Sequence, residues 1–136
     1  MTVGVQKARM NIRTARPADR PAIRDVARRS LQASYSLGPQ AINSAIEEWY
    51  DEERLEATLA DEDHLLLVAD DDGQVVGFSE SVVSADNTGT LLWLHVDPAH
   101  RGQGIASSLF DTTRDKLEEF GATHLRGRVL SDNAEG

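Results

Sequence analysis

The residues best suited to binding chemistry form one short glycine-rich segment, Arg101-Gly102-Gln103-Gly104-Ile105-Ala106. An apolar run ends just before it at Asp97-Pro98, and an amphipathic helical pattern follows it. The first N–H groups of a helix have no partners within the helix and lie at the positive end of its dipole, so they attract anions. Gly102 and Gly104 lack the Cβ atoms that would keep a phosphate from the backbone, and Arg101 adds a positive charge. The segment therefore predicts a loop that binds a pyrophosphate.

Two other phosphate-binding loops do not match this segment. The Walker loop needs a Gly-Lys-Ser or Gly-Lys-Thr sequence, which does not follow here. The dinucleotide fingerprint G-x-G-x-x-G needs a third glycine at position 107, where Ser107 stands. The remaining match is Arg101-x-x-Gly104-x-Ala106, preceded by a strand that ends near Val96. In this the sequence resembles the GNAT superfamily of acyl-CoA-dependent N-acetyltransferases, whose pyrophosphate loop has the form R/Q-x-x-G-x-G/A.

The resemblance implies that the chain binds acetyl-CoA as a co-substrate. Loop amides between Gly102 and Ala106 would hold the pyrophosphate, and the pantetheine would lie along the strand end. An amide near Val96 would polarise the thioester carbonyl, and one N–H aimed at a developing oxyanion lowers a barrier by roughly 3–4 kcal/mol. The expected cofactor-binding residues are Leu94, His95, Val96, Arg101, Gly102, Gln103, Gly104, Ile105, Ala106 and Asn133.

Two residues are candidates for the proton transfers of this reaction. Glu80 lies in the strand pattern Val76-Phe78-Glu80-Val82, where apolar neighbours on its own face would raise its pKa towards that of a useful base. A solvated carboxylate, or one paired with an arginine, is the alternative interpretation of Glu80. In several family members a Glu lies six residues before the position that matches Val96. That place holds Thr90 here, which would relay a fixed water.

The resemblance also implies a segment that this sequence does not supply. The family's usual general acid is a tyrosine in the helix after the strand that ends near Ser131, whereas this sequence continues only to Gly136, and its tyrosines are Tyr35 and Tyr50. The implied fold is therefore GNAT-like and incomplete at its C-terminus: either the chain is a shortened form of a longer acetyltransferase, or something else completes the site. An exposed sheet edge would follow Val129, and we expect the chain to form a homodimer through it.

The order of elements predicts an α/β fold of the α+β kind with a mixed sheet. Strand patterns cover 11–16, 64–69, 74–83, 90–96 and 123–130, and helical patterns cover 19–33, an interrupted region up to 62, and 104–120. Short turns join the three middle strands in antiparallel fashion, and the helix before the last strand makes the final pair parallel. Residues 1–10 show no pattern and are expected to form a disordered arm, which leaves 11–136 as a single domain.

Composition limits the classes of partner. The 136 residues include 14 Lys and Arg against 23 Asp and Glu, and the resulting net charge of -9 argues against nucleic acid and anionic lipid. No stretch approaches the ~18 apolar residues of a membrane helix, and the start has no apolar leader, so we expect a cytoplasmic protein. The surface, rich in Asp and poor in Lys, is typical of adaptation to high salt, or equally of a merely acidic protein.

The sequence argues against metal and thiol chemistry. It has no cysteine, which excludes a thiol nucleophile and thiolate metal sites. Its four histidines, His64, His95, His100 and His124, lack the spacing of metal ligands, so we expect no metal site and a solvent or core role for each. His95 would lie on the face opposite Leu94 and Val96.

These observations predict an N-acetyltransferase that moves acetyl from acetyl-CoA to a primary amine by direct attack in a ternary complex. The alternative is a non-catalytic acyl-CoA-binding module, or a subunit that lacks the general-acid segment. The amine acceptor is either a small molecule or a protein N-terminus or lysine. The aromatic residues Tyr35, Trp49 and Tyr50 either line the acceptor pocket or anchor amphipathic helices.

Overall fold

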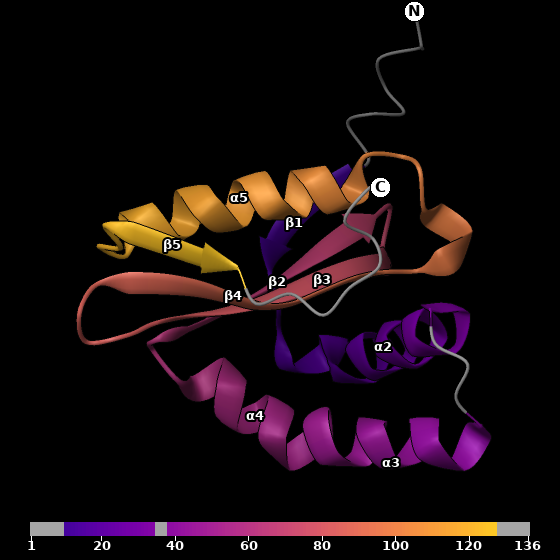
Figure 1. The fold of residues 1–136 in the computed structure, drawn as a ribbon. Helices are drawn as coiled ribbons and strands as arrows, with labels where there is room; N and C mark the ends of the chain where they lie inside the picture. The colour runs from indigo at the N-terminus through magenta and orange to yellow at the C-terminus, as the bar shows by residue number, and fades with distance from the viewer. Residues whose placement is uncertain (1–9, 35–37, 128–136) are drawn as a thin grey trace, which may run out of the picture.

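A five-stranded sheet separates two layers of helices (Figure 1). The computed structural model describes residues 10–34 and 38–127. Helix α5 (Ile105–Glu119) covers one face of the sheet, and three helices cover the other: α2 (Arg20–Ser34), α3 (Pro39–Trp49) and α4 (Glu52–Ala60). Two short 3-10 turns, η1 (Pro17–Asp19) and η2 (Pro98–His100), lead into α2 and towards α5. The strands are β1 (Met10–Thr14), β2 (His64–Asp71), β3 (Gln74–Val83), β4 (Thr88–Val96) and β5 (His124–Gly127).

The predicted mixed sheet is confirmed. Strands β1 to β4 pair in antiparallel fashion in chain order, and β5 pairs with β4 in parallel after the crossover through α5. The parallel pairing runs from Thr88 opposite His124 to Leu91 opposite Gly127. The second half of β4, from Leu92 to Val96, therefore has no partner on this side among the described residues. The outer strand β5 is exposed along its length, and the expected self-association through this edge stays a prediction.

The element ends follow from local chemistry. Asp72 and Gly73 both have positive φ angles, as the tight turn of a β2–β3 hairpin requires. Asp51 begins α4, since its carboxylate accepts the Arg54 N–H at 2.8 Å. Gly121, with φ of 103°, follows α5 in the left-handed conformation that commonly ends a helix.

Two bulges interrupt the regular alternation of the sheet. On β3, Gly77 pairs with Ala69 and Val75 pairs with Asp70, so Val76 is the extra residue. On β4, Leu92 is extra in the same way, between the residues opposite Glu80 and Ser81. Because of the first bulge, Val76 packs on the α5 side of the sheet, while Phe78 packs on the side of α2 to α4. The expectation that Val76 flanks Glu80 on its own face is therefore wrong, since a strict alternation takes no account of an inserted residue.

The core consists of two clusters, one on each face of the sheet. Aliphatic and aromatic side chains of α2, α3 and α4 pack against one face, and those of α5 pack against the other. The first cluster contains Ala15, Ile23, Val26, Ala27, Leu31, Ile42, Ile46, Tyr50, Leu55, Leu66, Val68, Val75 and Phe78. The second contains Leu65, Leu67, Ala69, Val76, Leu91, Leu94, Val96, Ile105, Leu109, Leu117 and Ala122.

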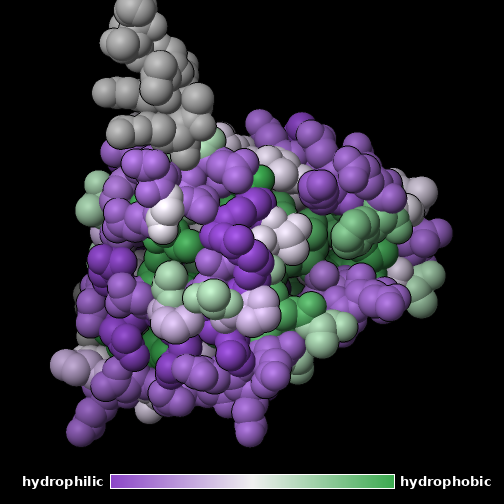
Figure 2. Space-filling view, turned by 180° about the vertical axis from the view of Figure 1, so that it is seen from behind, coloured by the Kyte–Doolittle hydropathy of each residue, from purple (hydrophilic) through white to green (hydrophobic). Residues whose placement is uncertain are grey.

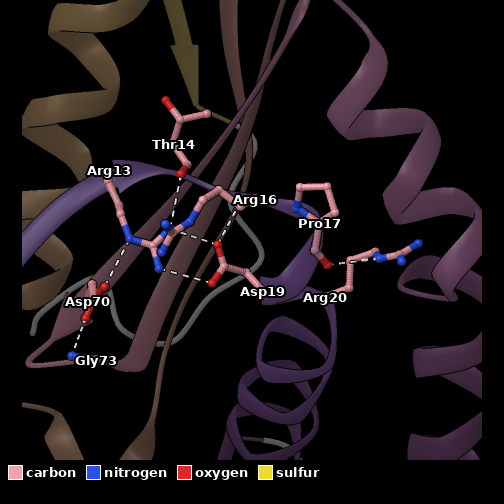
Figure 3. Close-up of polar contacts among 8 residues, drawn as sticks. All are labelled: Arg13, Thr14, Arg16, Pro17, Asp19, Arg20, Asp70 and Gly73. Carbon is pink, nitrogen blue, oxygen red and sulfur yellow. Dashed lines mark hydrogen bonds and ion pairs between the residues drawn. The ribbon is translucent and has the colours of Figure 1, made fainter.

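A cluster of charges around Arg13 fixes the start of the helical layer (Figure 3). Arg13 donates to both carboxylate oxygens of Asp19, at 2.8 and 3.1 Å, and to Asp70 at 3.0 Å. Asp19 also accepts the Arg16 N–H at 2.7 Å. The hydrogen bonds from Arg13 hold the pKa of Asp19 below its usual range, against the opposing effect of burial. The cluster thereby joins β1, η1 and the β2–β3 hairpin.

The surface is largely hydrophilic, as the acidic composition leads one to expect. Seen from the side opposite to Figure 1, hydrophobic residues reach the surface in patches that hydrophilic residues surround (Figure 2). None of the helices among the described residues has both the length and the apolar character needed to cross a bilayer.

Candidate active site

The glycine-rich segment forms the turn between β4 and α5, as predicted from its residues. Gly102 and Gly104 have φ angles of 81° and 79°, in the left-handed region that glycine adopts readily. A Cβ at either position would meet no atom within 4 Å, so the backbone conformation, and not crowding, requires glycine here. The first helical hydrogen bond runs from the Ser108 N–H to the Gly104 oxygen at 3.0 Å. The N–H groups of residues 105–107 precede it and point out of the end of α5.

A small hollow lies over this helix end. Its volume is about 210 Å³, including the part that opens to solvent. The hollow brings together the end of β4, the Arg101 side chain and the N-terminus of α5, and its lining is Val96, His100, Arg101, Gly102, Gly104, Ile105 and Ala106. Helix N–H groups, a guanidinium and two residues without Cβ atoms fit the chemistry of a pyrophosphate.

The end of β4 offers backbone groups beside this hollow. The Asp97 N–H donates to the Val76 oxygen on β3 at 2.8 Å. Successive residues of a strand direct their N–H groups to opposite edges, so Val96 and Leu94 direct theirs away from β3. On that side β5 pairs with β4 only as far as Leu91 among the described residues. The N–H groups of Leu94 and Val96 therefore face the side of β4 on which none of the described residues pairs with them.

His95 is buried on the other face of the sheet, opposite Leu94 and Val96 as expected. Its side chain is 2% exposed, and Nδ1 lies 3.0 Å from the Ser30 hydroxyl of α2. Arg101 donates to the same hydroxyl at 3.4 Å, so Ser30 connects the loop to the core. The His95 ring stacks on Trp93 with centroids 5.7 Å apart. The geometry therefore gives the His95 imidazole a packing role.

A second, larger cleft lies on the face of the sheet covered by α4. On the same measure its volume is about 1260 Å³, again including the part that opens to solvent. The cleft contains Glu80, the candidate base, beside the bulged stretch of β4 at Leu92 and Trp93. Carboxylates outnumber cations in its lining, which comprises Asp51, Glu53, Arg54, Leu55, Ala57, Thr58, Asp61, His64, Glu80, Leu92 and Trp93.

Glu80 lies at the floor of this cleft. Its side chain is 15% exposed, and burial raises the pKa of its carboxyl, an effect that the nearby His64 and Arg54 partly oppose. Tyr50 packs beneath it, 1% exposed, with its ring 5.6 Å from Phe78. Burial first, and the Glu80 charge second, raise the pKa of the Tyr50 hydroxyl. A partly desolvated carboxylate of this kind is suited to accept a proton near neutral pH.

Sequence comparison identifies the family. A model of the acetyltransferase (GNAT) family matches residues 22–135. The chain belongs to the GNAT acetyltransferase family. A comparison with curated proteins finds no significant match.

Solved GNAT structures share this fold. The PaiA N-acetyltransferase of Thermoplasma acidophilum, solved with coenzyme A, is 27% identical with a TM-score of 0.84, and the match covers 93% of this chain and 83% of that one. A GNAT acetyltransferase of Brucella melitensis, solved with acetyl-CoA, is 26% identical with a TM-score of 0.67, over 90% of this chain and 76% of that one. The ribosomal-protein-S18-alanine N-acetyltransferase of Escherichia coli is 21% identical with a TM-score of 0.68, and the match covers 93% of this chain and 70% of that one. At this identity the likeness shows a shared fold and nothing more.

The structure distributes the predicted site residues of this GNAT protein over two places. Val96, Arg101 and the loop glycines lie together at the hollow, whereas Gln103 is exposed on the loop and Leu94 packs under α5. Thr90 pairs with Val82 and Arg126 within the sheet and is not part of the cleft lining that includes Glu80. Asn133 lies outside the described residues.

The partners of Glu80 were not predicted from the sequence. His64 Nε2 lies 3.8 Å from Glu80 Oε2, and His64 Nδ1 lies 3.0 Å from Asp61 Oδ2. From its spacing, His64 was expected to have a solvent or core role and not to bind a metal. Among the residues that the structure describes, no three His, Cys, Asp or Glu side chains are grouped as a metal site. The predicted hairpin between β2 and β3 could have indicated this contact, because it brings the start of β2 close to the end of β3.

Proposed function

We propose that this GNAT protein transfers the acetyl group of acetyl-CoA to a primary amine by direct attack in a ternary complex. The observation that carries the proposal is the placement of the two sites on one strand. The hollow at the loop includes Val96 at the end of β4, and the acidic cleft includes Leu92 and Trp93 on the same strand. An acetyl group held along β4 therefore meets an amine held in the cleft. The chain contains no cysteine to form a thioester of its own.

The proposed role of the loop is to bind the pyrophosphate of acetyl-CoA. The free N–H groups at the start of α5 and the Arg101 guanidinium support this role. Coenzyme A supplies the activated acyl group as a thioester, and the Val96 N–H, which faces away from β3, would donate to the carbonyl oxygen as negative charge develops there.

A pair of glycine variants tests the loop. Gly104→Glu places a carboxylate in the hollow, and we expect it to weaken coenzyme A binding at least tenfold in calorimetric titration. Gly73→Glu is the matched control, because Gly73 also has a positive φ and open space around it but lies in the β2–β3 turn. Equal affinity in both variants and the wild type would refute the assignment.

The proposed role of Glu80 is to accept the proton that the amine loses. An amine of ordinary basicity is protonated near neutral pH and attacks only as the free base. Glu80 lies at the cleft floor with a raised pKa, so its carboxylate is a suitable acceptor. We expect Glu80→Gln to lower kcat about 100-fold with unchanged affinity for coenzyme A. An unchanged kcat would exclude Glu80 as the base.

The charge of the cleft favours an acceptor that carries positive charge. Asp51, Glu53, Asp61 and Glu80 line it, against Arg54 and His64. We expect a thiol-release assay with a panel of amines to give higher kcat/KM for diamines than for monoamines of equal length, with a preference that falls as salt is added. Equal values at all salt concentrations would contradict a role for these carboxylates.

A binding module is the second candidate. Tyr50, the tyrosine that the structure describes, has its hydroxyl buried without a hydrogen-bond partner, so it is not placed to protonate a leaving thiolate in the open cleft. This favours a protein that binds acyl-CoA without turnover. Affinity for acetyl-CoA with no thiol release from any amine of the panel would establish the module, and release would exclude it.

A further inference from the structure

Three ionisable side chains form a row from the floor of the cleft to its rim. Glu80 is 15% exposed, His64 is 26% exposed and Asp61 is 45% exposed. The distances between neighbours are 3.8 Å from Glu80 Oε2 to His64 Nε2 and 3.0 Å from His64 Nδ1 to Asp61 Oδ2. Each ring nitrogen of His64 thus faces one carboxylate. The row leads from the buried acid to water.

The backbone holds this row in place. The Asp61 carboxylate also accepts the Asp63 N–H at 2.8 Å, and the His64 N–H donates to the Asp61 carbonyl at 3.2 Å. The Val83 N–H donates to the Asp63 carbonyl at 2.9 Å, which fastens this turn to the end of β3. The Asp63 N–H first, and His64 second, hold the pKa of Asp61 below its usual range. Asp61 therefore stays ionised where it can orient the imidazole.

The bulge at Val76 sets the register between β2 and β3 that places His64 and Glu80 on one face. Beyond it, His64 lies opposite Val82 and Leu66 lies opposite Glu80. Residues opposite each other share a face, so His64 and Glu80 both point to the cleft side. Without the extra residue the register would shift by one, and His64 would point to the opposite face from Glu80. An inserted residue near the hairpin turn therefore brings the two side chains together.

Acetylation of an ammonium group releases one proton overall. R–NH3⁺ and the thioester give the amide, the free thiol and H⁺, because the thiolate keeps one of the two protons that nitrogen loses. The proton that leaves must travel from the buried carboxyl to water. We propose that His64 relays this proton from Glu80 to the solvent beside Asp61. The inference rests on the proposed acetyltransferase function.

Glu80 accepts a proton as the N–H bond of the amine breaks. The O–H bond of Glu80 then breaks while a bond forms to His64 Nε2. The N–H bond at the buried Nδ1 breaks as its proton passes to Asp61 Oδ2, 3.0 Å away, and the exposed Asp61 carboxyl releases that proton to water. Imidazole can accept a proton on one ring nitrogen and release one from the other near neutral pH, whereas the neutral amide of glutamine has no such pair of sites. In this scheme His64 does not touch the amine or the thioester, and it affects the reaction only through Glu80.

The charged groups around the relay come from several elements. Arg54 of α4 acts on Glu80 and lowers its pKa, and Tyr50 at the end of α3 lies close enough to interact with its charge. Glu53 of α4 and Asp51 line the same cleft. The relay is therefore surrounded by more carboxylates than cations.

The test compares His64→Gln with His124→Gln, a control on the exposed strand β5. With the best amine of the panel, we expect His64→Gln to lower kcat 10- to 100-fold at pH 7, with little loss above pH 9, where free amine and hydroxide are abundant. Affinity for coenzyme A should not change. Added imidazole should restore part of kcat, and Asp61→Asn should lose about fivefold. His124→Gln should behave as the wild type.

A second measurement needs no turnover. The NMR signals of the His64 ring should shift in Glu80→Gln, because the carboxylate that lies 3.8 Å from Nε2 is removed, while those of the His124 ring should not. Unchanged His64 ring signals in Glu80→Gln, or an unchanged kcat profile in His64→Gln, would refute the relay alone. A loss in His64→Gln that is equal at every pH and insensitive to imidazole would also overturn it. A wild-type protein that releases no thiol with any amine would refute the proposed function and the relay with it.

Discussion

Gly77 allows β3 to lie against the first turn of α5, and its replacement by alanine measures how tight this contact is. A Cβ at Gly77 would lie 3.0 Å from the His95 carbonyl oxygen, 3.2 Å from the Leu109 side chain and 3.3 Å from that of Ile105. The nearest of these is a backbone atom of β4, which cannot rotate away as a side chain can.

The expected cost follows from these distances. Overpacking a close-packed core lowers the free energy of unfolding by roughly 1–3 kcal/mol. Alanine also reduces the conformational entropy of the unfolded chain, which offsets about 0.4–1 kcal/mol of this loss. We therefore expect Gly77→Ala to lower the free energy of unfolding by about 1–2 kcal/mol, which corresponds to a fall in Tm of roughly 3–8 °C. Because Ile105 begins α5, the loop must move with it, and affinity for coenzyme A should fall severalfold.

Thermal and urea unfolding, together with calorimetric titration of coenzyme A, check this prediction. Gly127→Ala is the matched control, since a Cβ there meets nothing within 4 Å and Gly127 is not among the glycines with a positive φ. Its stability should stay within about 0.5 kcal/mol of the wild type. Should Gly77→Ala prove as stable as the control and bind coenzyme A as tightly, the contact between β3 and α5 does not require a glycine.

Three further predictions concern the fold. Asp19→Asn should lower the free energy of unfolding by about 2 kcal/mol at pH 7, because Arg13 loses a charged partner. Folding lowers the pKa of Asp19, so this stabilisation is present above the unfolded pKa of about 4 and is lost as pH falls through the folded pKa. The urea midpoints of the variant and the wild type should therefore converge in acid. Ser79→Ala should lower the free energy of unfolding by about 1–2 kcal/mol, because the buried Thr113 Oγ1 loses the Ser79 hydroxyl that lies 2.9 Å away. The double variant Ser79→Ala with Thr113→Val should recover most of this loss in urea unfolding. Light scattering should show a concentration-dependent dimer that Leu125→Lys on β5 weakens, and a monomer at all concentrations would contradict pairing through this edge.

The sequence predicted most of the fold because the periodic patterns are long. The apolar spacing predicted a helix at 104–120, and α5 covers Ile105–Glu119. The strand predicted at 74–83 is β3 to the residue. The parallel last pair followed from the crossover helix, and the glycine-rich turn before α5 followed from the glycines themselves, which adopt positive φ angles there. These are local properties of consecutive residues, so a sequence contains them.

The site at the cleft was predicted only in part, because it depends on register. Glu80 was identified from its apolar neighbours, of which Phe78 shares its face and Val76 does not. The meeting of Glu80 with His64 depends on the bulge at Val76, and nothing in a valine between two strand residues marks it as the inserted one. The bulge at Leu92 is of the same kind. Such features arise from the pairing of strands, which no single segment determines.

The sheet separates the surroundings of the two proposed binding sites. Helix α5 and its loop lie on one face, and α4 with the acidic cleft lies on the other (Figure 1). If the proposed sites are right, mutations that reshape α4 during evolution can alter the choice of amine and leave the binding of coenzyme A intact. Strand β4, which serves both faces, has no such freedom, so divergence among descendants of this chain should be slowest along it.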